Sequence, residues 1–65
     1  MRTLHVASKK VFRELVSAIE TDKNWKNTVY EIVNENEIVF ESDNCALQLC
    51  EMLKRKHKRA WTTKA

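Results

Sequence analysis

The stretch TVYEIVNENEIVFE, from Thr28 to Glu41, carries the strongest secondary-structure signal in the chain. Its two halves, residues 28–34 and 37–41, are rich in Val, Ile, Tyr and Phe, which favour β-strands. Asn-Glu-Asn separates the two halves, and such polar residues are typical of a turn between strands. The stretch therefore predicts a β-hairpin.

The register of this hairpin depends on the length of its loop. A three-residue loop, residues 34–36, pairs Ile32 with Ile38 and requires a left-handed residue at Asn36. A two-residue loop would mix apolar and acidic side chains on both faces, so we expect the longer loop. The buried face then consists of Tyr30, Ile32, Ile38 and Phe40. The other face alternates valine with glutamate: Val29, Glu31, Val33, Glu37, Val39 and Glu41.

A helix and a short strand are expected before the hairpin. In residues 8–20 the apolar side chains recur within a stripe of about 120°, which predicts an amphipathic helix with Ser8 as its N-cap. In residues 2–6, Leu4 and Val6 alternate with polar residues, which favours a strand, although a helix starting at Thr3 remains open. The polar residues 21–27 form a loop, from which Trp25 covers the edge of the core.

A long helix is expected after the hairpin. Ser42, Asp43 and Asn44 are three successive capping residues. The helix is predicted to run from Asp43 to about Trp61, followed by a short tail of residues 62–65. Its core-facing stripe consists of Ala46, Leu49, Cys50, Leu53, His57 and Ala60.

The chain of 65 residues is thus expected to form a single small α+β domain, in the order short β-α-β-β-α. Both helices should pack on one face of a small antiparallel hairpin sheet.

No apolar run approaches the ~20 residues of a membrane span, so we expect no membrane partner. The N-terminus lacks the apolar segment of a signal peptide, and two cysteines are too few for a disulfide framework, so a cytoplasmic location is expected.

Charge is strongly segregated along the chain. Residues 1–26 carry a net charge of +3, residues 27–51 of −6 and residues 52–65 of +6, which gives +3 for the whole chain. Five Lys or Arg residues fall within the six positions from Lys54 to Arg59. On a continuous helix, positions i, i+1, i+4 and i+5 project together, so Lys54, Arg55, Lys58 and Arg59 would share one surface.

This surface is the main candidate binding site. Lys56 would flank it, and Trp61 could stack on a base or anchor an interface. The residues Lys9, Lys10 and Arg13 form a candidate second patch. A simpler interpretation is a solvated helix end, since cations near a helix C-terminus stabilise it by roughly 0.3–1 kcal/mol each.

The sequence contains no signal for catalysis or for a cofactor. It has neither Gly nor Pro, which excludes glycine-rich phosphate loops. His5 and His57 are isolated, and no nucleophile–base pair can be assembled, so we expect no catalytic residues. Cys45 and Cys50 match no zinc-ligand spacing and are expected to be reduced, buried thiols, with no metal.

Two functional hypotheses follow. The first is a small, non-enzymatic regulatory protein that binds the phosphate backbone of nucleic acid through its basic C-terminal helix. The second is a protein-binding regulator or inhibitor, of the type found in phages, plasmids or bacteria. It would dock on an acidic protein through the same helix, or through the Val/Glu face of the sheet. A homodimer through the hairpin edge or the Val/Glu face is also open.

Overall fold

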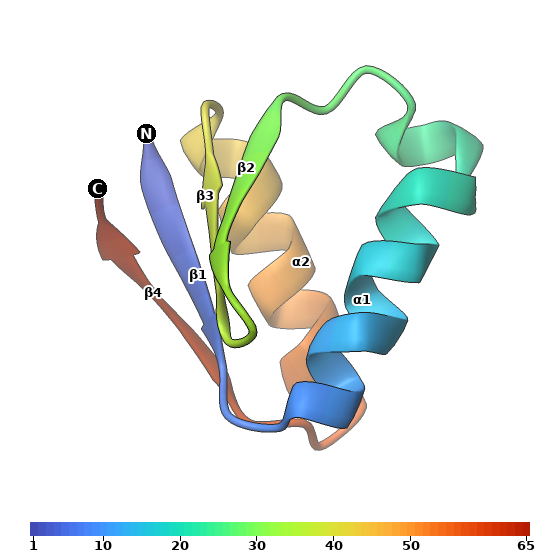
Figure 1. Ribbon diagram of the computed structural model, residues 1–65, viewed down its shortest axis with the longest axis vertical. Coiled ribbons are helices and arrows are strands. Elements are labelled where there is room, and N and C mark those ends of the chain that lie inside the picture. Colours follow the sequence, from blue (N-terminus) through green and yellow to red (C-terminus); the bar gives the residue numbers. More distant parts are fainter.

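The computed structural model describes all residues from 1 to 65 and consists of two layers, with both helices on one side of a sheet (Figure 1). The strands are β1 (Arg2–Val6), β2 (Tyr30–Asn34), β3 (Glu37–Phe40) and β4 (Ala60–Lys64). The helices are α1 (Lys9–Thr21) and α2 (Asp43–Arg55), with a short 3-10 helix η1 (Lys23–Trp25). The predicted α+β class is confirmed, as is the packing of both helices on one face.

The sheet has the strand order β2-β3-β1-β4, and every neighbouring pair is antiparallel. This β-α-β-β-α-β order is the topology of the ferredoxin-like, split βαβ arrangement. The strand predicted at residues 2–6 is confirmed, and it lies in the interior of the sheet between β3 and β4. Folds of this kind host many unrelated functions, so the topology alone assigns none.

The hairpin has the predicted pairing but a different loop. Tyr30 pairs with Phe40 and Ile32 with Ile38, as expected. The turn, however, is formed by Glu35 and Asn36 alone, and a bulge after Ile32 takes up the extra residue within β2. The predicted left-handed backbone at Asn36 is wrong, since His57 is the one residue with positive φ. The Asn36 side-chain amide instead donates to the main-chain carbonyls of Val6 and Ala7, which ties the turn to β1.

The helices begin where the capping residues predict. The Ser8 hydroxyl accepts a hydrogen bond from the N–H of Val11 at the start of α1. The Ser42 hydroxyl accepts one from the N–H of Cys45 at the start of α2. Each satisfies a main-chain donor that has no partner inside the first turn.

The end of α2 differs from the sequence prediction. The helix stops at Arg55, not at Trp61, and the backbone of His57 adopts a left-handed conformation with φ 60°. The N–H of Lys58 donates to the Leu53 carbonyl, and the N–H of His57 donates to the Lys54 carbonyl. This pair of bonds is a Schellman motif, here with histidine at the position that glycine usually occupies.

The predicted tail, residues 62–65, mostly belongs to a strand. Ala60–Lys64 pairs with β1 over its whole length, from Val6 opposite Ala60 to Arg2 opposite Lys64. Trp-Thr-Thr at positions 61–63 combines aromatic and β-branched residues, which pack well on a sheet. The prediction failed because the helix-terminating turn contains neither Gly nor Asn. His57 is exposed as a result, and Ala60 reaches the core from β4 instead of α2.

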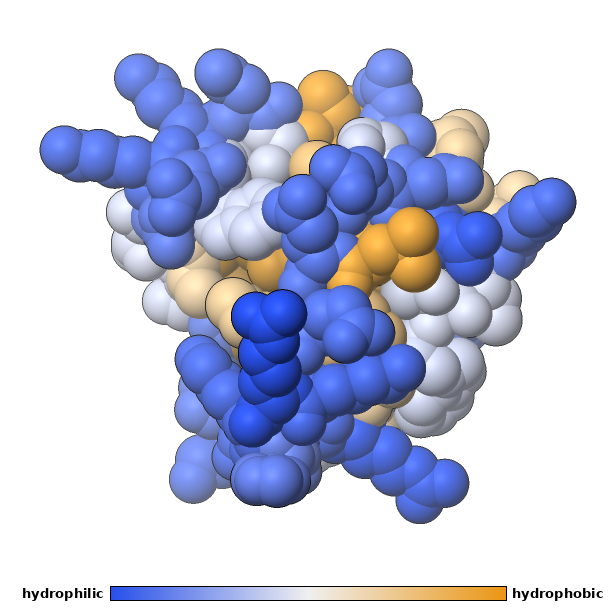
Figure 2. Space-filling view, turned by 180° about the vertical axis from the view of Figure 1, so that it is seen from behind, coloured by the Kyte–Doolittle hydropathy of each residue, from blue (hydrophilic) through white to orange (hydrophobic).

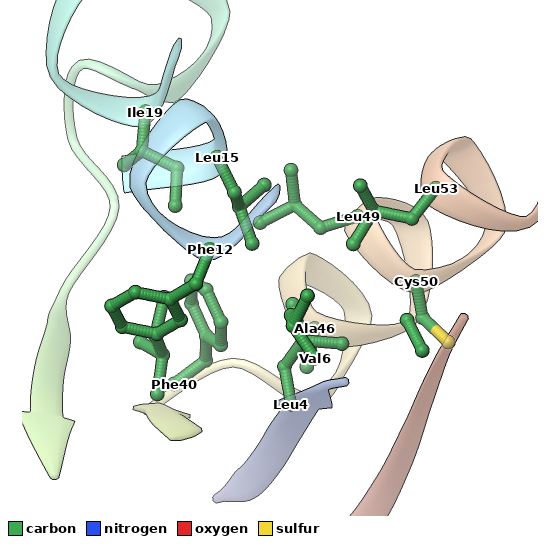
Figure 3. Close-up of a cluster of buried hydrophobic side chains, with 12 residues drawn as sticks. Leu4, Val6, Phe12, Leu15, Ile19, Phe40, Ala46, Leu49, Cys50 and Leu53 are labelled. Atoms are coloured by element: carbon green, nitrogen blue, oxygen red, sulfur yellow. The ribbon is translucent and has the colours of Figure 1, made fainter. Parts of the chain in front are cut away.

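The core lies between the sheet and the two helices, and its side chains point toward one another (Figure 3). It consists of Leu4, Val6, Phe12, Leu15, Ile19, Ile38, Phe40, Ala46, Leu49, Cys50, Leu53 and Ala60. Trp25 packs partly buried against this cluster, as predicted. The helices therefore bury the stripes that the sequence indicates, apart from His57.

Two residues of the predicted buried hairpin face are not fully buried. Tyr30 is half-buried against the core. Ile38 and Phe40 are fully buried, but Ile32 is 47% exposed. Ile32 lies opposite Ile38 on β2, the edge strand, which neither helix covers closely. Facing the helices is therefore not sufficient for burial at the edge of so small a sheet.

The paired isoleucines give a direct test of this packing. Ile38→Ala should lower the free energy of unfolding by roughly 2–5 kcal/mol, because it leaves a cavity in the core. Ile32→Ala should cost less than about 1 kcal/mol, since the side chain already contacts solvent. Urea unfolding followed by circular dichroism measures both variants. Equal losses at the two positions would contradict the packing described.

The left-handed backbone at His57 generates a second test. A non-glycine residue in this conformation costs about 1–2 kcal/mol, whereas glycine adopts it freely but adds entropy to the unfolded chain. His57→Gly should therefore raise the free energy of unfolding by about 0.5–1 kcal/mol. Lys56→Gly is the control: its φ of −89° needs no glycine, so this variant should lose stability. A destabilised His57→Gly variant would argue against the Schellman ending.

Candidate functional site

Two basic segments that are far apart in the sequence meet at one end of the molecule. The N–H of Ala7, just before α1, donates to the carbonyl of Arg59, just before β4, over 3.2 Å. A groove between the helices is lined by Glu14 of α1 together with Lys56 and Lys58. Both connections lie at the lower end of Figure 1, and hydrophilic side chains dominate the same end seen from behind (Figure 2).

We call this end the basic pole. It consists of Lys9, Lys10, Arg13, Lys54, Arg55, Lys56, Lys58 and Arg59, all of which are exposed. The predicted second patch, Lys9, Lys10 and Arg13, is thus next to the C-terminal cluster. The structure joins the two candidate sites into one.

The predicted helical surface of four cations is wrong in its geometry. Lys54 and Arg55 lie in the last turn of α2, but Lys58 and Arg59 lie beyond the helix, in the connection to β4. Lys56 is the C-cap between them. The cations therefore surround the end of the molecule and do not form one stripe along a helix.

Most cations of the basic pole have no acidic partner. Lys9 Nζ lies 2.9 Å from a carboxylate oxygen of Glu35, and Lys54 Nζ lies 4.0 Å from one of Glu51. The hydrogen bond from Lys9 and its positive charge lower the pKa of Glu35, and Arg13 acts in the same direction. The other six cations form no ion pair within 4.0 Å. Their charge is therefore free to attract an external anion.

The face of the sheet opposite the helices carries an aromatic pair. The rings of His5 and Trp61 face each other across β1 and β4, with centroids 5.3 Å apart and planes at 4°. Trp61 is 45% exposed. The sequence predicts Trp61 on the last turn of α2, whereas the structure places it on β4, beside the basic pole.

A network of hydrogen bonds fixes the orientation of His5. Its Nδ1 lies 3.0 Å from a carboxylate oxygen of Glu37, and its Nε2 lies 2.7 Å from the Thr63 hydroxyl. The Asn34 amide donates to the other oxygen of Glu37. The network therefore spans all four strands, from β2 to β4.

Hydroxyl, imidazole and carboxylate follow one another in this network as in a nucleophile-activating triad. Catalysis by such a triad relies on a water-excluding site with donors aimed at the developing negative charge. Thr63 is instead exposed on an open sheet face. We therefore assign the network a positioning role: it holds His5, and through it Trp61, in place.

A shallow depression of about 540 Å³ adjoins the aromatic pair. It extends from His5 and Trp61 to the turn between β2 and β3. Its lining residues are His5, Val6, Ala7, Lys9, Asn34, Glu35, Asn36, Glu37 and Trp61. Lys9 connects this depression to the basic pole.

The remaining sequence candidates do not gather into a site. Cys45 is half-buried and Cys50 is buried, both as free thiols, and burial raises the pKa of the Cys50 thiol. No three His, Cys, Asp or Glu side chains come together in a way that could hold a metal ion. Neither helix has the length and apolar character required to cross a membrane.

Sequence reasoning placed Glu37 on the Val/Glu face but missed the network on the open sheet face. Strand alternation also indicates His5, between the buried Leu4 and Val6. It does not indicate Asn34, because the bulge after Ile32 changes the face on which Asn34 lies. Thr63 and Trp61 could not be placed there, because β4 was predicted as helix and tail. The contact between His5 and Trp61 joins the two ends of the chain, and no local pattern indicates it.

Comparisons with known proteins identify no relative: no protein family, curated protein or solved structure matches this chain. The functional argument therefore rests on the geometry of the basic pole and of the open sheet face.

Proposed function

We propose that this protein is a small, non-enzymatic regulatory protein that binds nucleic acid through phosphate contacts made by the basic pole. The supporting observation is the convergence of two basic segments, at residues 9–13 and 54–59, on one end of the fold. A cluster of cations neutralises several phosphates at once and releases their counterions, which drives binding. A cytoplasmic location is part of this proposal, and two free thiols fit a reducing compartment.

The simpler interpretation, a stabilised helix end, accounts for few of these charges. Lys54 and Arg55 lie in the last turn of α2, where cations are favourable. Lys9 and Lys10 occupy the first turn of α1, which contains no acidic residue. Cations there oppose the helix dipole and reduce stability. Binding of an anion at this end gives these unfavourable charges a function.

The salt dependence of binding tests the proposal. If about five phosphates are neutralised, the slope of log K against log salt concentration should be near −4.5 for a duplex. Lys10→Gln combined with Arg59→Gln removes one cation from each segment and should flatten this slope by about 1.8 units. Fluorescence anisotropy of a labelled duplex at three salt concentrations measures it.

The matched control is Lys23→Gln combined with Lys26→Gln. It removes the same charge from exposed positions beyond the opposite end of α1, so the slope should change little. Both double variants should keep their stability within about 0.5 kcal/mol, because the side chains are exposed. Equal effects of the two variants, or no micromolar binding at about 50 mM salt, would overturn the proposal.

A second candidate function rests on the outer edge of β2. Val29, Ile32 and Val33 are 61%, 47% and 57% exposed, and β2 pairs with β3 only. An exposed strand edge with apolar side chains offers main-chain donors and acceptors to another strand. A second copy of the chain fits this edge: in an antiparallel pair centred on Ile32, each Glu31 lies opposite a valine. No like charges then face each other across the pair.

Sedimentation analysis tests this pairing. Wild-type protein should dimerise with rising concentration, and Ile32→Lys should remain monomeric because it places two cations opposite each other. Leu47→Lys is the control, since Leu47 is similarly exposed, at 44%, but lies on α2. Wild-type protein that stays monomeric at all concentrations would exclude self-pairing. A protein partner bound to the same edge would then be sought by pull-down after nuclease treatment.

A further inference from the structure

The aromatic pair on the open sheet face extends the proposed function. Trp61 lies on β4, the edge strand, and His5 of β1 stacks on one side of its indole. No strand lies beyond β4, so the other side of the indole faces past the sheet edge. An exposed, rigidly held indole is a large surface on which a planar group can stack.

The depression beside this pair has the polar groups that would suit a nucleobase. Its walls are fixed by internal contacts: the Asn36 amide donates to the main chain of β1, and Glu37 accepts from His5 and Asn34. Fixed polar groups bind a ligand with little loss of side-chain entropy. Carboxylate and amide oxygens accept hydrogen bonds from the N–H groups of bases, which are amino groups in adenine, cytosine and guanine and the ring N3–H in thymine.

The charges in and around the depression favour different positions for the base and for the phosphates of a nucleotide. Inside it, Glu37 and the Glu35 carboxylate disfavour a phosphate. At its margin lies Lys9, which belongs to the basic pole and also lines the depression, and Arg59 directly precedes β4. A nucleotide with its base toward Trp61 and its phosphates on the basic pole matches this distribution of charge.

We infer that Trp61 and the adjoining depression bind an unpaired base, so that the protein prefers single-stranded nucleic acid. This inference rests on the proposed function, because phosphate contacts at the basic pole supply most of the affinity. The bases of a duplex are already stacked on each other and cannot reach the indole. Single strands present bases that are free to stack.

Three probes of equal length separate the base from the phosphate: a thymidine 12-mer, an abasic 12-mer and a 12-base-pair duplex. The thymidine strand should bind more tightly than the abasic strand.

Trp61→Ala should weaken binding of the thymidine strand roughly 5- to 150-fold, as for other base–aromatic contacts. The same variant should change abasic-strand and duplex affinity less than about 2-fold and leave the salt slopes unchanged, since no phosphate contact is lost. Trp61→Phe should restore most of the affinity for the thymidine strand.

A spectroscopic readout covers the case in which Trp61→Ala disturbs the fold. In Trp25→Phe, Trp61 is the only tryptophan, and its fluorescence should be quenched by the thymidine strand but not by the abasic one. Trp25 lies against the core on η1, so this substitution should leave the affinity unchanged.

The outcomes distinguish this inference from the proposed function. If the thymidine and abasic strands bind equally and no quenching occurs, the stacking inference is overturned, while phosphate binding remains. If none of the three probes binds, the proposed function fails, and the inference fails with it.

Discussion

The arrangement of this protein depends on the turn that ends α2. His57 adopts a left-handed backbone, and two main-chain N–H groups donate hydrogen bonds to carbonyls in the last turn of the helix. The chain then reverses direction and returns along β1 as β4. If α2 continued straight, residues 60–64 would leave the sheet, and the main chain of β1 would be unpaired along one edge. β1 would then be an exposed edge strand, with a row of unpaired main-chain donors and acceptors.

The same turn assembles the candidate site. Its residues carry the cations of the C-terminal cluster, and the strand that follows begins with Ala60 in the core and Trp61 on the open face. The connection from β1 to α1 lies beside it, joined by the hydrogen bond between Ala7 and Arg59. Positive charge and an exposed aromatic ring therefore meet at one end of the sheet because two connections meet there. Loops at one end of a rigid scaffold commonly carry function for this reason.

Much of the fold could be predicted from local patterns. The hairpin pairing, the caps at Ser8 and Ser42 and the core stripe of α2 up to Leu53 are each encoded in short stretches. Such signals are local because the relevant contacts lie within a few residues. The burial of Ile38 and Phe40 also followed from alternation, whereas the exposure of Ile32 depends on its position at the sheet edge.

The candidate site was less predictable because it depends on contacts between distant residues. The cations were identified from the sequence, but their convergence follows from the path of the chain after Arg55. Histidine at a Schellman position is not a recognisable sequence signal for the end of a helix, so the prediction extended α2 through the turn. The stacking of His5 on Trp61 therefore could not be predicted, since it depends on the pairing of β4 with β1.

The pairing of β1 with β4 also has a consequence for how the chain folds. β1 is the earliest strand in the sequence and β4 the latest, so this pairing closes the largest loop in the structure. Contacts of high sequence separation form slowly, because the entropy of loop closure is lost before they contribute. Until residues 60–64 arrive, one edge of β1 remains open to incorrect partners. We therefore expect the pairing of β1 with β4 to be among the last contacts of the sheet to form, so that partly folded chains expose this edge of β1.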